Sequence, residues 1–510
     1  MASNPHVASA VTMLTITKTI SLGSYRSIPF VRLEGVAHGE LSPSENIPDL
    51  DKAARNARGN VEYQTRVVLI APADPKQSQG RLLVDVPNRG LPVSHAFYNS
   101  PRQRPLPIGS LDAGLGFLQE QGFMMVSTQW ELGHGFKPPQ FVDEQGMTRF
   151  VEAAGFAAVR DVARFLRDSV QSDNPLAGAV KRVYAAGYSQ TSRFLKSFLL
   201  NGFNLVEGQQ VIEGFHLVGG AAGQLPLMAS GTGPGTVAGS TPAPPNLEHR
   251  GVHEEPFTYG AVMATLQARN EPLPKIFVTH FNIDYMGGRA SLTRTGAHGV
   301  ADLALPETVR MYDIAGSAHL NMREQYKLCE SMHGQLDWSP PLRAQLVALD
   351  HWVSDQLEPP PSCLMPLRSA RADETVYGAP RYLPEATVLV PQTDADDNPL
   401  GGIQVPDVAV PLGTHGRPNA PVTNVICRLA GTYKPFFALQ QERLQANDSR
   451  LSLEERYPEG LNQYVQRVRE VSDQLVAQRY LLPADAAVIV NAAADEALLK
   501  PKPTRSIFRL

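Results

Sequence analysis

The tetrad Gly187-Tyr188-Ser189-Gln190 constrains the fold of this chain most strongly, because of what stands on either side of it. Residues 183–186 form an apolar, strand-like run before it, and residues 192–199 form a helix-like run after it. A strand that turns sharply into a helix lifts the serine hydroxyl out of the turn, and a glycine two positions earlier lets the turn close. The pattern therefore predicts that Ser189 is a nucleophile. An ordinary serine in the first turn of a helix is the alternative, since Thr191 stands where a second glycine is usual.

A nucleophilic serine needs a base and an orienting acid, and the chain supplies both in a suitable order. The strand-like run 275–281 is followed by Asp284, and the strand-like run 309–314 is followed by a turn that ends at His319. Ser, Asp and His, each after a strand, predict that His319 is the general base and that Asp284 fixes its tautomer. Asp302 and Asp313 are rival carboxylates, and a loop histidine bonded to backbone is the alternative for His319.

Acyl transfer also requires N–H donors for the oxyanion that forms in the transition state. The backbone N–H of Gln190 directly follows the predicted nucleophile and is the first expected donor. The second is expected in the turn after the strand-like run 81–86, where either Arg89 or Gly90 can supply it. An ordinary turn at the exit of a strand is the alternative for this segment.

Residues 186–194 resemble the G-x-S-Q-S-G-R signature of a little-characterised group of bacterial α/β-hydrolase-domain proteins, regarded as hydrolases of carboxylic esters. Further segments resemble the same group, namely residues 56–63, 87–90, 312–316 and 452–457. The resemblance implies an α/β-hydrolase fold with Ser189 as nucleophile and His319 as base, and it names no natural substrate. The chain departs from the group at Thr191-Ser192, where the group carries Ser-Gly, and at Asp284, where it carries glutamate.

The alternation of elements predicts an α/β fold with a mostly parallel central sheet covered by helices on both faces. From residue 81 to residue 357, apolar strands alternate with helical patterns, which is typical of such a sheet. We expect residues 1–80 to form a β-rich extension of this core. Residues 358–510 follow a proline-rich boundary and are expected to form an accessory region, first loop-rich and then helical. That region is expected either to brace the core or to border the substrate entrance.

The segment 211–272 is longer than a simple crossover requires, and residues 230–245 are rich in glycine and proline. Such a segment predicts a cap or lid over the site. We expect the side chains of Phe257, Tyr259 and Met263 to line the substrate pocket, together with Trp130 after an apolar strand. Packing inside the cap, or in the core for Trp130, is the alternative.

Composition limits the classes of partner. A net charge of -4 over 510 residues, with no basic cluster, gives no reason to expect nucleic acid. No apolar run reaches the length of a membrane span, and no signal-peptide pattern precedes the first strand. Three widely separated cysteines exclude a dense disulfide framework, although one pair can still form a bond. We therefore expect a cytoplasmic protein.

Two apparent cofactor motifs are incomplete. Residues 394–399 begin like a calcium loop but carry proline where glycine is needed, and residues 114–119 lack the third glycine of a dinucleotide fingerprint. We expect neither a metal nor an organic cofactor. The sequence thus predicts a serine hydrolase of small-molecule carboxylic esters, with a lactonase, an amidase, an acyltransferase or a non-catalytic binding protein of the same fold as alternatives. Oligomeric state stays open.

Overall fold

The structure is a computed structural model, and it describes residues 9–102, 105–225, 257–296, 301–320, 329–370, 389–421 and 424–500. The chain divides into two compact units. Unit 1 comprises Met1–Val278, Leu303–Val309 and Leu349–Leu357, and unit 2 comprises Thr279–Asp302, Arg310–Ala348 and Glu358–Leu510. The predicted division into three consecutive regions stays a prediction.

Within the described residues, ten strands form one large sheet in the order β1-β2-β3-β5-β4-β9-β12-β13-β14, with β6 paired to β3. Their bounds are β1 (Ala10–Tyr25), β2 (Ile28–Leu41), β3 (Val61–Pro72), β4 (Arg81–Asp85), β5 (Phe123–Thr128), β6 (Phe136–Lys137), β9 (Arg182–Tyr188), β12 (Gly214–Val218), β13 (Lys275–Phe281) and β14 (Val309–Ile314). The boundary between the units falls within β13 and within β14. An α/β fold with a large, mostly parallel central sheet was predicted, and this prediction is confirmed.

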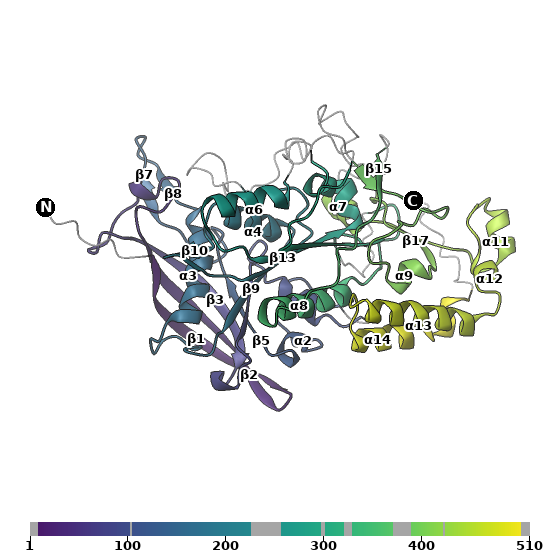
Figure 1. The fold of residues 1–510 in the computed structure, drawn as a ribbon, viewed down its shortest axis with the longest axis horizontal. Helices are drawn as coiled ribbons and strands as arrows, with labels where there is room; N and C mark the ends of the chain where they lie inside the picture. Colours follow the sequence, from purple (N-terminus) through teal and green to yellow (C-terminus); the bar gives the residue numbers. More distant parts are fainter. Residues whose placement is uncertain are drawn as a thin grey trace. The chain divides into compact units, whose positions relative to one another are not determined.

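The N-terminal part of unit 1 is an antiparallel extension of this sheet. β1 pairs with β2, β2 with β3, and β3 with β5, all antiparallel; Figure 1 shows β1, β2 and β3 side by side near the N-terminus. Burial alternates along the first half of β3, from buried Val61 to exposed Arg66, and is continuous over its second half. Alternation is typical of a strand with one solvated face, and a continuous buried run is typical of a strand covered on both faces.

The central strands of unit 1 run parallel and end together beneath the predicted nucleophile. β5 pairs with β4, β4 with β9 and β9 with β12, all parallel. Tyr188 at the end of β9 lies opposite Val218 at the end of β12, and Ala186 lies opposite Asp85 at the end of β4. The loops that follow β4, β9 and β12 therefore begin at the same edge of the sheet.

Helices α1 (Ser94–Asn99), α2 (Phe117–Glu120), α3 (Ala154–Asp168), α4 (Gln190–Leu200) and α6 (Tyr259–Ala268) belong to unit 1. α3 packs on β1, β2, β5 and β9, and α4 packs on β9, β12 and α6. The buried side of α3 carries Val159, Val162 and Phe165, which recur at helical spacing. Unit 1 also holds the short hairpins β7 (Gln140–Val142) with β8 (Thr148–Phe150) and β10 (Leu205–Val206) with β11 (Gln209–Gln210).

Only part of the predicted cap segment 211–272 can be followed. Residues Gly214–Val218 form β12 and therefore belong to the central sheet. Residues 226–256 lie outside the described residues, and α6 packs on α4. The lid itself stays a prediction, and any lid begins after β12.

Unit 2 contains α7 (Asn282–Gly287), α9 (Pro406–Ala409), α10 (Val425–Ala430), α11 (Gln440–Gln445), α12 (Leu453–Arg456), α13 (Leu461–Ala477) and α14 (Pro483–Ala493). Its short ladders are β15 (Leu367–Ser369) with β16 (Leu389–Pro391) and β17 (Gly413–His415) with β18 (Tyr433–Pro435). α8 (Ser339–Ser354) contributes to both units. Single 3₁₀ turns occur at Leu50–Lys52, Pro75–Gln77, Ala290–Thr293 and Glu496–Leu498.

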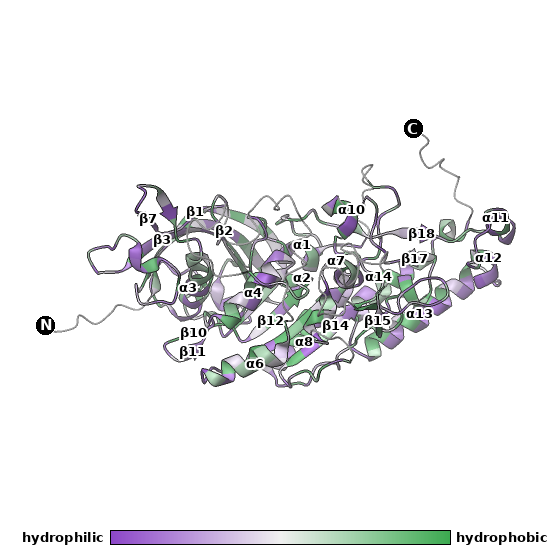
Figure 2. Ribbon diagram, turned by 90° about the horizontal axis from the view of Figure 1, so that it is seen from above, coloured by the Kyte–Doolittle hydropathy of each residue, from purple (hydrophilic) through white to green (hydrophobic). Residues whose placement is uncertain are grey.

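The long C-terminal helix α13 packs on α14 within unit 2, and both hydrophobic and hydrophilic residues occur along it in Figure 2. Its buried side carries Tyr464, Val468, Ser472 and Leu475, which recur at helical spacing. The Ser472 hydroxyl donates to the carbonyl of Val468 at 2.7 Å, and this bond satisfies a polar group that would otherwise be buried without a partner.

Candidate active site

Ser189 occupies a strained turn between β9 and α4. Its backbone has φ 56° and ψ -111°, in the half of conformational space that L-residues rarely adopt. Its N–H donates to the carbonyl of Val218 at the end of β12, at 2.8 Å. A side chain on Gly187 would bring its Cβ to 2.5 Å from the carbonyl of Thr191, so glycine is required there. This is the strand-turn-helix geometry that the tetrad predicts.

Thr191 closes the turn in place of the usual second glycine. Its hydroxyl accepts from the N–H of Tyr188 at 2.9 Å and donates to the carbonyl of the same residue at 3.2 Å. Both Thr191 and Ser192 are fully buried. Gly220, in the loop after β12, lies directly against the Ser192 hydroxyl and makes room for it. The departure from the G-x-S-Q-S-G-R pattern is therefore accommodated by a side-chain hydrogen bond and by a glycine elsewhere.

The predicted oxyanion turn after β4 is held by side chains of its neighbours. The indole N–H of Trp130 donates to the carbonyl of Pro87 at 2.8 Å, and the Gln129 amide donates to the carbonyl of Gly90 at 2.9 Å. The Asn88 amide donates to the carbonyl of Tyr188 at 3.0 Å, directly before Ser189. The first two bonds hold the turn to residues 129 and 130, and the third holds it to the residue before Ser189.

Gln190 links this turn to α4 through its side chain. The N–H of Arg89 donates to Gln190 Oε1 at 3.2 Å, and Gln190 Nε2 donates to Glu131 Oε1 at 3.3 Å. Arg89 and Gly90 both have positive φ, 48° and 78°. The N–H of Arg89, one of the two candidates for the second oxyanion donor, thus already has an acceptor in the protein.

Glu131 was missed by sequence reasoning. It follows Trp130 in the loop after β5 and is fully buried, and its Oε2 makes no hydrogen bond within the described part of the chain. Burial raises the pKa of its carboxyl above the ordinary value, and positive charge on His134 partly offsets this effect. A glutamate three residues past an apolar strand carries no pattern that distinguishes it from an exposed loop residue.

Asp284 and His319 lie together in unit 2. Asp284 stands in the first turn of α7, where its Oδ2 accepts from the N–H of Phe281 at 2.8 Å. Its Oδ1 lies 2.7 Å from His319 Nδ1, and both side chains are buried. Because a carboxylate only accepts, this bond puts a proton on Nδ1, so that Nε2 of the neutral ring is an acceptor.

Ser317 ties the loop of His319 to α7. Its hydroxyl accepts from the N–H of Asn282 at 3.1 Å and donates to the carbonyl of Ile314 at 2.5 Å. Its carbonyl accepts from the N–H of Ile283 at 3.3 Å. The element that carries Asp284 and the loop that carries His319 are thereby joined two residues before the histidine.

The rival carboxylates have other partners. Asp313 accepts from the Tyr285 hydroxyl at 2.9 Å, from Arg294 at 3.0 Å and from the N–H of Met365 at 2.8 Å. Asp302 receives two hydrogen bonds from Arg294, each at 2.5 Å. Both acids therefore accept hydrogen bonds from Arg294, which is buried.

The predicted pocket residues are all buried. The ring centroid of Phe257 lies 4.8 Å from the ammonium nitrogen of Lys196, and the ring packs edge-on against Tyr259. The Tyr259 hydroxyl makes no hydrogen bond among the described residues, and burial raises its pKa. Met263 accepts a weak contact from the Thr308 hydroxyl at 3.6 Å. Trp130 packs against Phe194 and Phe156, which stack on each other, in addition to its bond to Pro87.

The described residues contain no group of three or more His, Cys, Asp or Glu side chains arranged to hold a metal. The carboxylates of the acidic turn at residues 394–398 have partners in the protein. Asp394 accepts from backbone N–H groups of the turn, and Asp396 and Asp397 pair with Arg456 and Arg417. Among the helices that the structure describes, none is long and apolar enough to cross a membrane.

The solved structures that match this chain have low sequence identity to it and low TM-scores. An S-formylglutathione hydrolase from Staphylococcus aureus is 10% identical over 55% of this chain and 88% of its own, with a TM-score of 0.24. Acetyl xylan esterase 1 from Thermoanaerobacterium sp. JW/SL YS485 is 12% identical over 52% of this chain and 73% of its own, with a TM-score of 0.25. A glucuronoyl esterase from Solibacter usitatus is 13% identical over 44% of this chain and 55% of its own, with a TM-score of 0.21. These values support no inference about activity.

The comparison of sequences is more decisive. No curated protein matches this chain. A family model described as an alpha/beta hydrolase domain matches residues 127–491, which is more than half of the 510 residues. The match begins in β5 and ends in α14, and it includes Ser189, Asp284 and His319. The chain therefore belongs to the alpha/beta hydrolase domain family.

Proposed function

We propose that this chain hydrolyses carboxylic esters through an acyl-enzyme on Ser189, with His319 as general base and Asp284 as the acid that orients it. The observation that carries the proposal is the backbone of Ser189, which holds a non-glycine residue at positive φ between a buried strand and a helix. Such strain persists where surrounding structure enforces it, and it clusters at functional sites. The Asp284–His319 hydrogen bond gives independent support.

The reaction begins when Ser189 Oγ attacks the ester carbonyl carbon and its proton passes to Nε2 of His319. Asp284 stabilises the resulting imidazolium through the Nδ1–H bond. The tetrahedral intermediate collapses, and His319 returns the proton to the departing alcohol. Water then attacks the acyl-enzyme by the same route and releases the acid and free Ser189.

The oxyanion is bound by the N–H of Gln190, at the first turn of the eleven-residue helix α4, and by the N–H of Arg89 or Gly90. An oxyanion on Arg89 would replace Gln190 Oε1 as the acceptor of that N–H. The substrate pocket includes Trp130, Phe257, Tyr259 and Met263, whose apolar surfaces suit the acyl or alcohol group of an ester.

Cytoplasmic location stays a prediction. Unit 2 contains a disulfide between Cys329 and Cys427, and Cys363 is a free thiol. Such bonds persist in oxidising compartments and are rare in the cytosol. Fractionation of the source cells, with the protein detected by antibody, decides between the cytosol and an oxidising compartment.

A fluorophosphonate tests the proposal without knowledge of the natural ester, because the reagent needs a serine activated by a base. We expect stoichiometric labelling at Ser189, mapped by mass spectrometry, and its loss in His319→Ala. Ser192→Ala is the matched control, since it removes a buried hydroxyl three residues away that makes no hydrogen bond among the described residues. Absence of labelling in folded wild-type protein, or turnover of aryl esters by Ser189→Ala, would refute the assignment. Assays with lactones and amides then define the leaving group.

A further inference from the structure

The loop of His319 rests on a segment from the C-terminal part of the chain. This segment, residues 415–421 and 424–431, is called the strap below. The N–H of Leu320 donates to the carbonyl of Leu429 at 3.1 Å. On the other side of the histidine, a side chain on Gly316 would place its Cβ 3.1 Å from that of His415. The strap therefore contacts the loop both before and after His319.

The same strap contacts α7, which carries Asp284. The Asn282 amide donates to the carbonyl of Gly416 at 2.6 Å. A Cβ on Gly431 would lie 3.3 Å from Ile283 and 3.4 Å from the methyl group of Ala318, so the strap packs closely on α7 and on the residue before His319. The two partners of the Asp284–His319 bond thus share one support.

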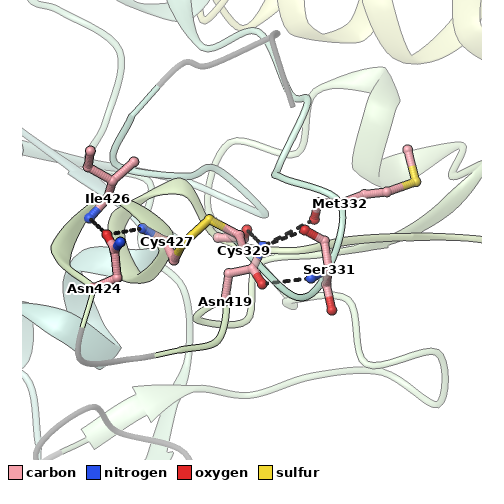
Figure 3. Close-up of a disulfide and its surroundings, with 8 residues drawn as sticks. Cys329, Ser331, Met332, Asn419, Asn424, Ile426 and Cys427 are labelled. Carbon is pink, nitrogen blue, oxygen red and sulfur yellow. Dashed lines mark hydrogen bonds between the residues drawn. A yellow bond between two sulfur atoms is a disulfide. The ribbon is translucent and has the colours of Figure 1, made fainter. Parts of the chain in front are cut away.

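The strap is bonded to residues 329–334. This segment is the next described part of the chain after residue 320. Figure 3 shows the disulfide between Cys329 and Cys427 beside the side chain of Asn419. Asn419 is fully buried; its Oδ1 accepts from the N–H of Ser331 at 3.1 Å, and its Nδ2 donates to the carbonyls of Ser331 at 2.9 Å and Gly431 at 3.1 Å. Backbone bonds from Glu330 to Ala420 and from Gly334 to Ala430 complete the anchor.

These anchors matter because the strap has little regular structure of its own. Its helix, α10, is six residues long, too short to be stable in isolation. The disulfide closes a loop between residues 98 positions apart, and such a bond removes many conformations that the unlinked chain could adopt. The fully buried Asn419 side chain adds four hydrogen bonds, including a long one of 3.5 Å to the carbonyl of Met332.

We propose that the strap positions His319 against Asp284, with Asn419 as the positioning residue and the Cys329–Cys427 bond as the lock. The inference rests on the proposed function for its effect on catalysis. A dithiol reductant opens the lock by transferring two electrons and two protons: the S–S bond breaks, two thiols form, and the dithiol is oxidised to a cyclic disulfide. The His319 loop then loses part of its support and turnover falls, while reoxidation restores both.

Hydrogen exchange measures the loop directly, whether or not the protein is active. Opening of the disulfide, verified by mass spectrometry, is expected to speed exchange in a peptide spanning residues 314–320 by about tenfold, with β9 unchanged. The kcat of ester hydrolysis is expected to fall by about 10- to 100-fold with KM within about twofold, because displacing a catalytic group by about 1 Å costs that much. The double variant Cys329→Ser with Cys427→Ser should behave like reduced protein. Cys363→Ser, which keeps the bond, should respond to the reductant as wild type does.

Asn419→Ala tests the positioning residue with the disulfide intact. Like reduction, it should speed hydrogen exchange at residues 314–320 and lower kcat while KM changes little. Asn204→Ala is its matched control. Asn204 is a buried asparagine of unit 1 that bonds to both backbone groups of Ile212, so its loss costs similar stability. It should leave exchange at residues 314–320 unchanged.

The outcomes separate the two claims. A protein that neither turns over esters nor labels at Ser189 refutes the proposed function, while exchange at residues 314–320 still supports or overturns the strap. An active protein whose exchange and kcat are unaffected by verified reduction and by Asn419→Ala overturns the strap and leaves the proposed function standing.

Discussion

The hydroxyl of Thr191 bonds to both backbone groups of Tyr188, accepting from its N–H and donating to its carbonyl across the turn that carries Ser189. A side-chain hydroxyl thus closes the turn at the position where the general G-x-S-x-G pattern has glycine. Because Thr191 is fully buried, neither backbone group of Tyr188 has water as an alternative partner on that side.

Thr191→Val keeps the shape of the side chain and removes these bonds. We expect the free energy of unfolding to fall by about 1–3 kcal/mol, since the N–H of Tyr188 loses its acceptor, while the carbonyl of Tyr188 keeps the Asn88 amide as a donor. We also expect slower labelling of Ser189 by a fluorophosphonate. Urea unfolding and the second-order labelling rate measure the two effects. Thr265→Val, which removes an exposed hydroxyl bond to the carbonyl of Ala261 in α6, should change neither, and a wild-type labelling rate in Thr191→Val would contradict this role.

Asn88 holds the predicted oxyanion turn against the carbonyl of Tyr188. Asn88→Ala should lower kcat by about 10- to 100-fold, less than the loss of an oxyanion donor itself, with a small change in KM. Asn88→Asp should be at least as damaging, because a carboxylate would face a carbonyl oxygen that it cannot donate to. Steady-state kinetics on an aryl ester compare the two variants. Equal activity of wild type and Asn88→Asp would rule out this function of Asn88.

Asp284→Asn tests the orienting acid. An amide cannot stabilise the imidazolium as a carboxylate does, so kcat should fall by about 10³- to 10⁴-fold with the fold intact. Asp302→Asn is the control, since the Asp302 side chain is 47% exposed and pairs with Arg294. A larger loss of kcat in Asp302→Asn than in Asp284→Asn would reverse the assignment of the acid.

Asp85, at the end of β4, should make stability depend on pH. Burial raises the pKa of its carboxyl to about 6 from an ordinary 3.8, although hydrogen bonds from Ser94 oppose this. Between these two values the folded chain binds one proton more than the unfolded chain, so this group's contribution to stability decreases as pH rises and is constant above pH 6.

Asp85→Asn keeps an acceptor for the N–H of Ser94 and cannot ionise. Relative to wild type it should gain stability on the order of 2 kcal/mol between pH 4 and pH 7.5. Urea unfolding of both proteins at these two pH values gives the difference. Asp448→Asn is the comparison, because Arg450 lowers the pKa of Asp448 to about 2 and the difference from wild type should be nearly constant over this range. A constant difference for Asp85→Asn would refute the prediction.

The sequence by itself determined the elements on which this protein depends. A short apolar run such as residues 183–186, followed directly by a turn signal, favours a buried strand, and the glycine at 187 is required locally by the backbone of Thr191. The order of Ser189, Asp284 and His319 after three strands follows from the same local patterns. These features depend on neighbours in the chain, which is why periodicity and turn chemistry predict them.

Only the tertiary structure decided which side chains meet. Asp284, Asp302 and Asp313 are equivalent in sequence, and the buried Arg294 distinguishes them by engaging the last two. Three cysteines permit three pairings, and packing of α10 near residue 329 selects Cys329 with Cys427. The burial of Glu131 and the hydrogen bonds of Asn419 likewise join residues distant in the chain. Such contacts depend on how separate elements pack, and no local pattern carries that information.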